Sequence, residues 1–434
     1  FFSSLKNKKM GKGADKETSE VSGKSFDATV LAPKDEFIKD INFEGFKRDI
    51  DELGKTLLEN QGPADLAHLN KIIGWSRMCS WLGALTCWIA INPISIFLMS
   101  CGTMTRWAII GHHVCHGGFD KCSEGKYNRF KFALGPIRRF LDWLDWMLVE
   151  AWNIEHNQLH HYHLGEDTDP DLVEANLDFL RTLPVPVFLK YLAVVVMSGI
   201  WKWWYYAPNT YKELKANQLR RSGVTVDRSI TDTACVLSPE FFIYGHPLFS
   251  PAEFLFKVLG PYFFIRFIAI PLPFFVVDHY VNGSYHYATN ALISLVLADI
   301  LTNIHSFIVI VTNHAGDDLY RFKQHCTPHS ATFYLRQVLS STNFRCGGDL
   351  NDFMHGWLNY QVEHHLWPNL SMLSYQRSQP IVKGICEKHG IPYVQHSVFW
   401  RLHKLVEVMV GTKTMRKYPV AFENKPDITE STDH

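Results

Sequence analysis

The chain has 434 residues, and its 43 basic and 43 acidic side chains give a formal net charge of zero. Such a balance gives no indication of nucleic acid as a partner, and we expect none. The nine cysteines lack the paired spacings of a disulfide ladder or a zinc knuckle, and we expect them to be reduced. Histidine is the unusual component, because many of its 22 copies lie in a few short clusters.

The N-terminal segment, residues 1–40, is polar and is expected to be loosely held. Its basic, acid-free opening up to Gly13 is compatible with the remnant of an organellar transit peptide, and a truncated start explains it equally well. Met10-Gly11 resembles a myristoylation start only superficially, because Asp15 stands where Ser or Thr is needed.

Residues 41–70 predict an amphipathic helix, with apolar side chains recurring at helical spacing from Phe43 to Leu58. We expect this helix to pack on the body of the protein, and the membrane interface is the alternative.

Four apolar runs predict transmembrane helices in two hairpins, at residues 72–91, 94–110, 254–277 and 288–311. Each run has close to the ~20 residues that cross a hydrocarbon core of ~30 Å. The charged residues Arg266 and Asp299 inside the second pair should face the protein interior, together with His305.

A fifth apolar run, residues 191–201, is too short to span and ends among aromatic residues, so we interpret it as interfacial or re-entrant. Residues 117–141 are rich in Lys and Arg, whereas the turns at 92–93 and 278–287 contain neither. This asymmetry places the basic loops and the histidines on one membrane face. Residues 71–411 therefore predict an all-α integral membrane domain with interfacial helices and a helical soluble cap, followed by a polar tail at 412–434.

Three histidine clusters lie on that face: His112, His113 and His116; His156, His160 and His161; and Gln361, His364 and His365. In the first two clusters a four-residue spacing places two imidazoles on one side of a helix, where they could reach a common metal. The adjacent His161 points about 100° around the helix, which suits a second metal. His113 remains a rival to His112.

Together the clusters exceed the four ligands that one zinc ion normally takes. No His-Glu-x-x-His motif occurs, which argues against a zinc peptidase. Many imidazoles around an open site suit redox iron, and two iron ions would use them all.

The clusters resemble the HxxxH, HxxxHH and QxxHH boxes of the membrane fatty acid desaturases. The third box and the following Leu-Trp-Pro-Asn-Leu are similar to those of the front-end subgroup, which inserts a double bond between an existing one and the carboxyl end. The similarity covers roughly residues 66–393, and His113 stands where many members carry Asp. The resemblance implies iron ligands at His112, His116, His156, His160, His161, His314, His364 and His365.

Residues near the boxes are candidates for supporting roles. Asp167, Asp169 and Asp171 could accept hydrogen bonds from ligating imidazoles, and turn or cap chemistry is the alternative for each. Gln361 either ligates through its amide oxygen or orients a neighbour, and orientation is favoured. His305 lies more than two helical turns before His314, so it should not touch the same iron and could instead bond Asp299 or Asn303. Surface or packing roles are expected for His163, His325, His329 and His355.

The resemblance implies an oxygen-dependent desaturase in which a narrow apolar tunnel selects one methylene of a lipid acyl chain. Trp107, Phe263 and Phe307 are candidates for the tunnel wall. No His-Pro-Gly-Gly haem signature is present, so a separate small cytochrome or ferredoxin is the expected electron donor. The expected location is the endoplasmic reticulum or an organellar membrane, plastid or mitochondrial, and an oligomer or larger complex is compatible with the sequence. The rivals are an acyl or sphingolipid hydroxylase on the same scaffold and a non-catalytic lipid-binding subunit.

Overall fold

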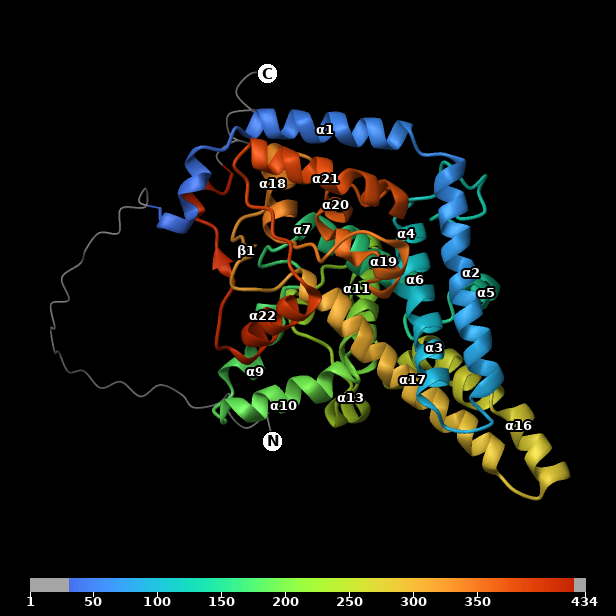
Figure 1. Cartoon of the computed structure of the whole chain (residues 1–434). Coiled ribbons are helices and arrows are strands. Elements are labelled where there is room, and N and C mark those ends of the chain that lie inside the picture. Colours follow the sequence, from blue (N-terminus) through green and yellow to red (C-terminus); the bar gives the residue numbers. More distant parts are fainter. Residues whose placement is uncertain (1–30, 425–434) are drawn as a thin grey trace, which may run out of the picture.

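Helix α1 (Phe43–Glu59) lies along the top of the cap in the computed structural model, which describes residues 31–424 (Figure 1). It packs on α18 (Ala331–Leu339) and α21 (Met372–Lys388), and it buries Phe46 and Ile50 completely. The expected packing of this helix on the body is therefore confirmed. The transit-peptide and myristoylation patterns and the end of the polar tail lie outside the described residues.

The first hairpin consists of α2 (Pro63–Thr86) and of α3 (Pro93–Met104), which continues through the π-helical segment η3 (Thr105–Gly111) into α4 (His112–Cys115). Helix α2 begins nine residues before the expected apolar run, because Pro63 suits a first helical position and Asp65 accepts a hydrogen bond from the Gly62 amide at 2.8 Å. Gly102 allows α3 to approach α2 closely, since an added Cβ would collide with Ser80.

Three helices of the described chain are long and apolar enough to cross a membrane: Pro93–Cys115, Pro251–Asn282 and His286–Asn313. The sequence analysis predicted four spans, and α2 is the one that this count leaves out. Asp65, His68, Lys71 and Arg77 make α2 more polar than the others, although it packs along α3 over its length.

The second hairpin joins the Pro251–Asn282 helix to α17 (His286–Ile310). The first arm alternates α-helical and π-helical stretches, and its α-helical parts are α14 (Pro251–Phe254), α15 (Gly260–Phe264) and α16 (Leu272–Val277). Asp299 accepts hydrogen bonds from Tyr262 at 2.7 Å and from Arg266 at 3.1 Å, so these charged groups face the interior as expected.

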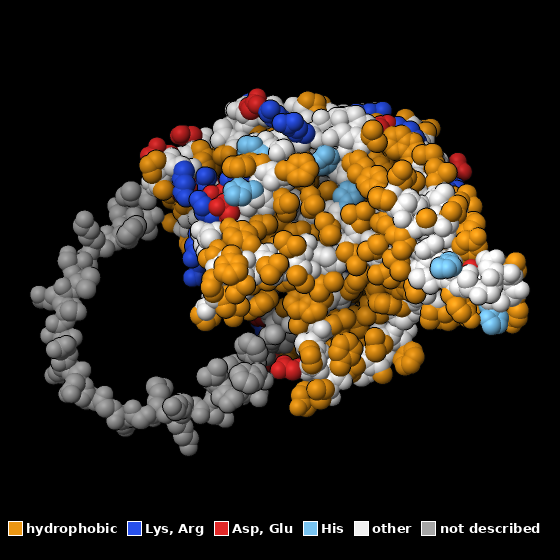
Figure 2. Space-filling model, turned by 60° about the horizontal axis from the view of Figure 1, so that its bottom comes forward, with side chains coloured by type: hydrophobic (Ala, Val, Ile, Leu, Met, Phe, Trp, Pro, Cys, Tyr) orange, Lys and Arg blue, Asp and Glu red, His pale blue; other side chains and the backbone are white. Residues whose placement is uncertain are grey.

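The fifth apolar run forms α10 (Val187–Ser198), which turns by 78° into the helix Lys202–Arg221, of which α11 is Ala207–Arg221. Such a bend fits either a broken span or a re-entrant segment. Phe188, Leu192 and Val195 of α10 are largely exposed. Figure 2 shows hydrophobic side chains over much of this lower face, as a membrane-embedded surface requires.

Short helices complete the cap and its junction with the spans: α5 (Pro136–Asp142), α6 (Val149–Trp152), α7 (His161–His163), α8 (Val173–Asn176), α9 (Asp178–Thr182), α12 (Arg228–Asp232), α13 (Pro239–Tyr244), α19 (Asp349–Met354), α20 (Gln361–Leu366) and α22 (Val398–Val410). The named strands of the described chain are β1 (Tyr320–Arg321) and β2 (Arg416–Lys417), which pair in parallel. The body is thus mostly helical with few strands, as predicted.

Candidate metal centre

The three histidine clusters converge in one buried layer beneath the cap. Ligand-capable atoms of four side chains lie within 4.8 Å of one another, and we call these the first histidine group: His112, His116, His156 and His364. Ligand-capable atoms of three further side chains also lie within 4.8 Å of one another, and we call these the second histidine group: His160, His314 and His365. The expectation that distant parts of the chain bring their imidazoles to one place is therefore confirmed.

Helix ends place these side chains. His112 and His116 follow the π-helical end of a span, where Gly111 leaves room for the ring of Trp143. His156 and His160 lie on a second π-helical segment, η4 (Asn153–His160). His364 and His365 lie on α20, and His314 follows the short 3₁₀ helix that ends α17.

The π-helical geometry changes which residues of the second cluster share a face. A π-helix closes its hydrogen bonds over five residues, so positions five apart approach each other. Nε2 of His156 accordingly lies 3.3 Å from Nε2 of His161. The ring centroid of His161 is 4.5 Å from that of His116 and 4.3 Å from that of His365, which places it between the two groups. The four-residue spacing had suggested that His156 and His160 share one metal, and ligand-capable atoms of these two residues and of Asp171 do lie within 4.8 Å of one another.

Burial keeps these imidazoles neutral, the form that binds metal. Burial lowers the pKa of His116, His156, His161 and His364 well below the ordinary value, and neighbouring imidazoles lower it further. Nε2 of His116, Nδ1 of His156 and Nδ1 of His161 are buried without a hydrogen-bond partner. Buried polar atoms normally have partners, so these free nitrogens fit metal ions.

Asp169 is the carboxylate that contacts this layer most closely. Its Oδ1 accepts a hydrogen bond from Nδ1 of His160 at 2.8 Å, whereas Asp171 is 3.9 Å from the same nitrogen. Burial alone would lower the pKa of His160, but the charge and hydrogen bond of Asp169 outweigh it and raise this pKa. Asp167 points elsewhere: it is 53% exposed and pairs with Arg321 at 3.6 Å, so it does not support the histidines.

Gln361 also meets the second histidine group. Its Nε2 lies 2.9 Å from Nε2 of His314, and its Oε1 accepts a hydrogen bond from Asn313 at 3.1 Å. Because the amide nitrogen faces the ring and the amide oxygen is held by Asn313, this contact lets Gln361 orient His314, which is the role favoured from the sequence.

Several other histidines hydrogen-bond to protein groups and belong to neither histidine group. Nδ1 of His113 donates to the carbonyl oxygen of Ile109 at 2.7 Å, and His113 belongs to neither group, so His112 is the residue of the first cluster that joins His116. His305 bonds the carbonyl of Met354 at 2.7 Å, which differs from the expected partners Asp299 and Asn303. His163 and His325 both contact Glu166.

The sequence analysis missed side chains that hold the histidines from outside. Gln337 Oε1 lies 3.2 Å from Nδ1 of His365, and the Tyr375 hydroxyl lies 3.3 Å from Nδ1 of His364. Glu155 is buried beside Asp171, and burial together with that carboxylate raises its pKa well above the ordinary value. Only Glu155 is next to a histidine in sequence, so spacing could not have revealed the other two.

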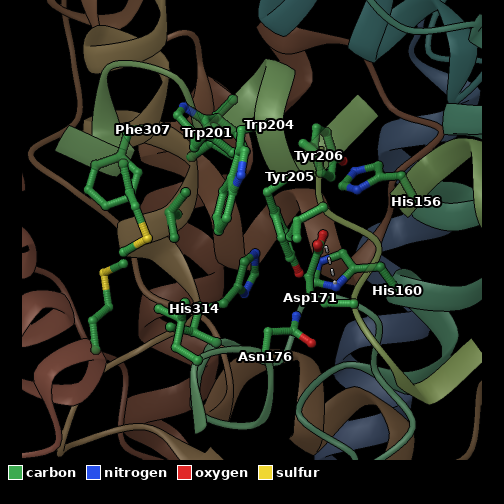
Figure 3. Close-up of a pocket in the computed structure, with 18 of the residues that line it drawn as sticks. His156, His160, Asp171, Asn176, Trp201, Trp204, Tyr205, Tyr206, Phe307 and His314 are labelled. Atoms are coloured by element: carbon green, nitrogen blue, oxygen red, sulfur yellow. Dashed lines mark ion pairs between the residues drawn. The ribbon is translucent and has the colours of Figure 1, made fainter. Parts of the chain in front are cut away.

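An apolar cavity reaches the histidines from the spans (Figure 3). It has a volume of about 120 Å³, and its walls include Trp201, Trp204 and Phe307. Of the three wall residues predicted, Phe307 is correct. Trp107 instead packs in the core beside Trp201, and Phe263 packs against Trp146. A mostly apolar, aromatic cavity that ends at histidines suits a hydrocarbon chain.

Fold and site together define a membrane protein with a histidine cluster that fits a metal site beside an apolar cavity. The fatty acid desaturase family model matches residues 86–397. The chain therefore belongs to the fatty acid desaturase family.

Curated relatives agree with this assignment. The chain is 27% identical over 307 residues to an acyl-lipid (7-3)-desaturase of Rebecca salina, covering 68% of this chain and 59% of the relative. It is 23% identical over 392 residues to an NADPH-dependent stearoyl-CoA 9-desaturase of Mycobacterium tuberculosis, covering 84% and 80%. It is 24% identical over 254 residues to the Delta(5) fatty acid desaturase A of Dictyostelium discoideum, covering 56% and 48%.

The chain thus spans about three-fifths of the length of the first of these relatives. The comparison with solved structures gave no significant match.

Proposed function

We propose that this protein is an oxygen-dependent desaturase that introduces a double bond into a lipid acyl chain. The observation that carries the proposal is the meeting of two histidine groups with the end of an apolar cavity, which places a metal centre where a hydrocarbon chain would stop. Unactivated methylene groups resist every amino-acid side chain, so bound metal must supply the oxidising power.

Two iron ions fit the donor set. The first histidine group would hold one ion and the second the other, with His161 between them and Gln361 beside His314. Neutral imidazoles suit redox iron, and the surplus of histidines over carboxylates separates this site from one built for magnesium or calcium. When bound, the two iron ions would supply the chemistry of dioxygen activation, and a donor outside the protein would supply the electrons.

The protein's own residues perform three tasks. Asp169 fixes the orientation and the protonated nitrogen of His160. The walls at Trp201, Trp204 and Phe307 hold the acyl chain and exclude water from the reacting methylene. Because neighbouring methylenes are nearly identical chemically, this fit determines where the double bond forms.

The substrate is proposed to be an acyl chain carried by a membrane lipid, with the double bond placed on the carboxyl side of an existing one. The named activities of the acyl-lipid and Delta(5) relatives support this, as does the third box with its leading Gln361. Phe179, at the edge of the apolar cavity, is 54% exposed and belongs to the helix preceding the apolar α10. A chain could therefore enter directly from the bilayer.

The electron donor is proposed to be a separate small cytochrome or ferredoxin that binds the cap. The basic loop at residues 117–141 supports this, because Lys121, Lys126 and Lys131 are exposed there. An acidic carrier would be attracted to such a surface.

We also propose that α2 crosses the membrane with α3 as a fourth span, since the two helices pack against each other.

The decisive experiment is expression in a host that lacks polyunsaturated lipids, followed by mapping of double bonds in its acyl chains. We expect a new double bond with the intact protein and none with His160→Ala or His364→Ala at equal protein level. His403→Ala is the matched control, because the side chain of His403 is 54% exposed on α22 and belongs to neither histidine group. A hydroxylated chain would assign the protein to the hydroxylases, and a purified protein without iron would indicate a non-catalytic lipid-binding subunit.

A further inference from the structure

Two different cavities reach the histidine layer, and they meet different residues of it. The apolar cavity is lined by His112, His156, His160 and His314. A second hollow, which we call the polar cleft, is lined by His116, His161 and His365. Within the described chain none of these seven side chains lines both. The layer therefore has one side that faces the spans and another that faces the cap.

The polar cleft is large and suited to water. Its volume is about 970 Å³, compared with about 120 Å³ for the apolar cavity. Its walls carry the carboxylates of Asp51 and Glu150, the amides of Asn157 and Gln158, and the guanidinium of Arg129, set between apolar side chains such as Leu134, Phe333 and Trp367. Ions and water keep polar partners in such surroundings, whereas a hydrocarbon chain would displace water from groups that need it.

Of the three histidines of the layer that have an unpartnered buried nitrogen, His116 and His161 line the polar cleft, whereas His156 lines the apolar cavity. His116 and His161 are 5% and 4% exposed, and each has one ring nitrogen with no hydrogen-bond partner. A species that travels through the cleft would thus meet free imidazole nitrogens at its inner end.

We propose that the polar cleft is the aqueous route by which hydrated metal ions reach and leave the histidine layer, separate from the route of the lipid. The proposal rests on the metal centre of the proposed function. A divalent cation cannot shed its water before it finds ligands, because desolvation without compensating contacts is costly. The apolar cavity offers few such contacts, since Asp171, Asn176 and Gln361 lie among mostly apolar walls, while the larger cleft exposes more carboxylate, amide and guanidinium groups.

Helix α1 forms part of the wall of this route. Gly54 lies against the indole of Trp367, where an added Cβ would collide with the ring nitrogen. Leu58, one turn later, is half-buried and lines the polar cleft. Thr56 lies on the same helix but is exposed and does not line the cleft. A change in size at Leu58 should therefore alter passage, and the same change at Thr56 should not.

The test measures the rate at which a hydrophilic chelator such as EDTA removes iron from the purified, iron-loaded protein in lipid nanodiscs, with metal content as the readout. We expect Leu58→Trp to slow removal severalfold and Leu58→Ala to accelerate it. Thr56→Trp should leave the rate unchanged. Ala234→Trp narrows the apolar cavity and should also leave it unchanged, although product formation falls. If Leu58→Trp fails to accumulate, Leu58→Ala decides the question alone.

The inference is overturned if both Leu58 variants lose iron at the rate of the original protein, or if Ala234→Trp is the variant that slows removal. The second result would make the lipid cavity the metal route. Failure of the proposed function gives a different result, because a protein that binds no iron has no removal rate to measure. If the variants bind iron and lose it to the chelator at rates that do not depend on residue 58, the metal centre stands and only the cleft is excluded as its entrance.

Discussion

The carboxylate of Asp169 accepts a hydrogen bond from Nδ1 of His160 at 2.8 Å, and both side chains are buried. A proton held on Nδ1 leaves the lone pair on Nε2, which is the nitrogen that can bind a metal. The second oxygen of Asp169 accepts a hydrogen bond from the Gly165 amide at 2.9 Å, so the carboxylate is itself fixed. This pair therefore determines how the second histidine group is presented.

Asp169→Ala should weaken metal binding by about 10–100-fold, the usual cost of removing a partner behind a ligating histidine. Iron content per chain across a titration of free iron measures this. The matched control is Asp167→Ala, two residues away, because Asp167 is exposed and contacts Arg321 rather than a histidine. If the two variants bind iron with equal affinity, Asp169 does not support metal binding by His160.

His161→Ala should reduce occupancy of both metal positions, whereas His160→Ala should affect one. His161 lies between the groups, whereas His160 belongs to the second group and is also close to His156 and Asp171, so its loss leaves the four histidines of the first group intact. Four ligands are enough for one ion, so His160→Ala should retain roughly one iron per chain. Elemental analysis of the purified variants checks this, and identical stoichiometries would show that His161 has no bridging position.

The boxes and most of the spans could be predicted because their signals are local. A run of apolar residues and a cluster of histidines each lie within one stretch of chain, and the positive loops fix their side of the membrane. This charge asymmetry places the three clusters on one membrane face, where they can converge. Helix α2 shows the limit, since the buried Asp65 and His68 and the exposed Lys71 and Arg77 lower its apolarity although it packs along α3.

Local spacing could not give the grouping of the histidines. An α-helical periodicity pairs His156 with His160, but the π-helical segment brings His161 onto the face of His156. The partners Gln337 and Tyr375 come from segments whose own sequence carries no metal-binding pattern. Phe263 is likewise an aromatic residue of a span, as a cavity-wall residue would be, and only its packing against Trp146 shows its role.

Arg336→Met should lower the free energy of unfolding by up to about 3–5 kcal/mol, because it removes the guanidinium from the buried carboxylate of Glu166 and leaves the imidazoles of His163 and His325 beside it. The two groups are 3.0 Å apart, and their side chains are 1% and 3% exposed. Thermal unfolding in detergent micelles measures the loss. Lys388→Met provides the comparison, since Lys388 is 61% exposed and a surface pair contributes about 0–1 kcal/mol. Similar melting temperatures for both variants would contradict the assigned role of Arg336.

The attachment of α1 should weaken in acid. Hydrogen bonds from Lys388 and His389 lower the pKa of Asp49 from its ordinary 3.8 to about 2, which outweighs the opposing effect of burial. A lowered pKa stabilises the folded form above the ordinary value, and this stabilisation is lost as pH falls from about 4 towards 2. Protease cleavage before α2, followed against pH, should increase over that range. Asp49→Asn should flatten this dependence, and an unchanged profile in the variant would exclude Asp49 as its origin.

Phe307→Leu should broaden the positions at which the double bond forms. Phe307 is 4% exposed and lines the apolar cavity, so a smaller side chain lets the acyl chain shift along it. Discrimination worth one methylene is about 1–3 kcal/mol, which a loosened wall can remove. Mass-spectrometric mapping of the products should then show neighbouring positional isomers. Phe263→Leu changes an equal volume on a residue that packs against Trp146 outside the cavity, and its products should keep a single position. Should both variants yield the same isomers as the original protein, Phe307 would not help to select the methylene.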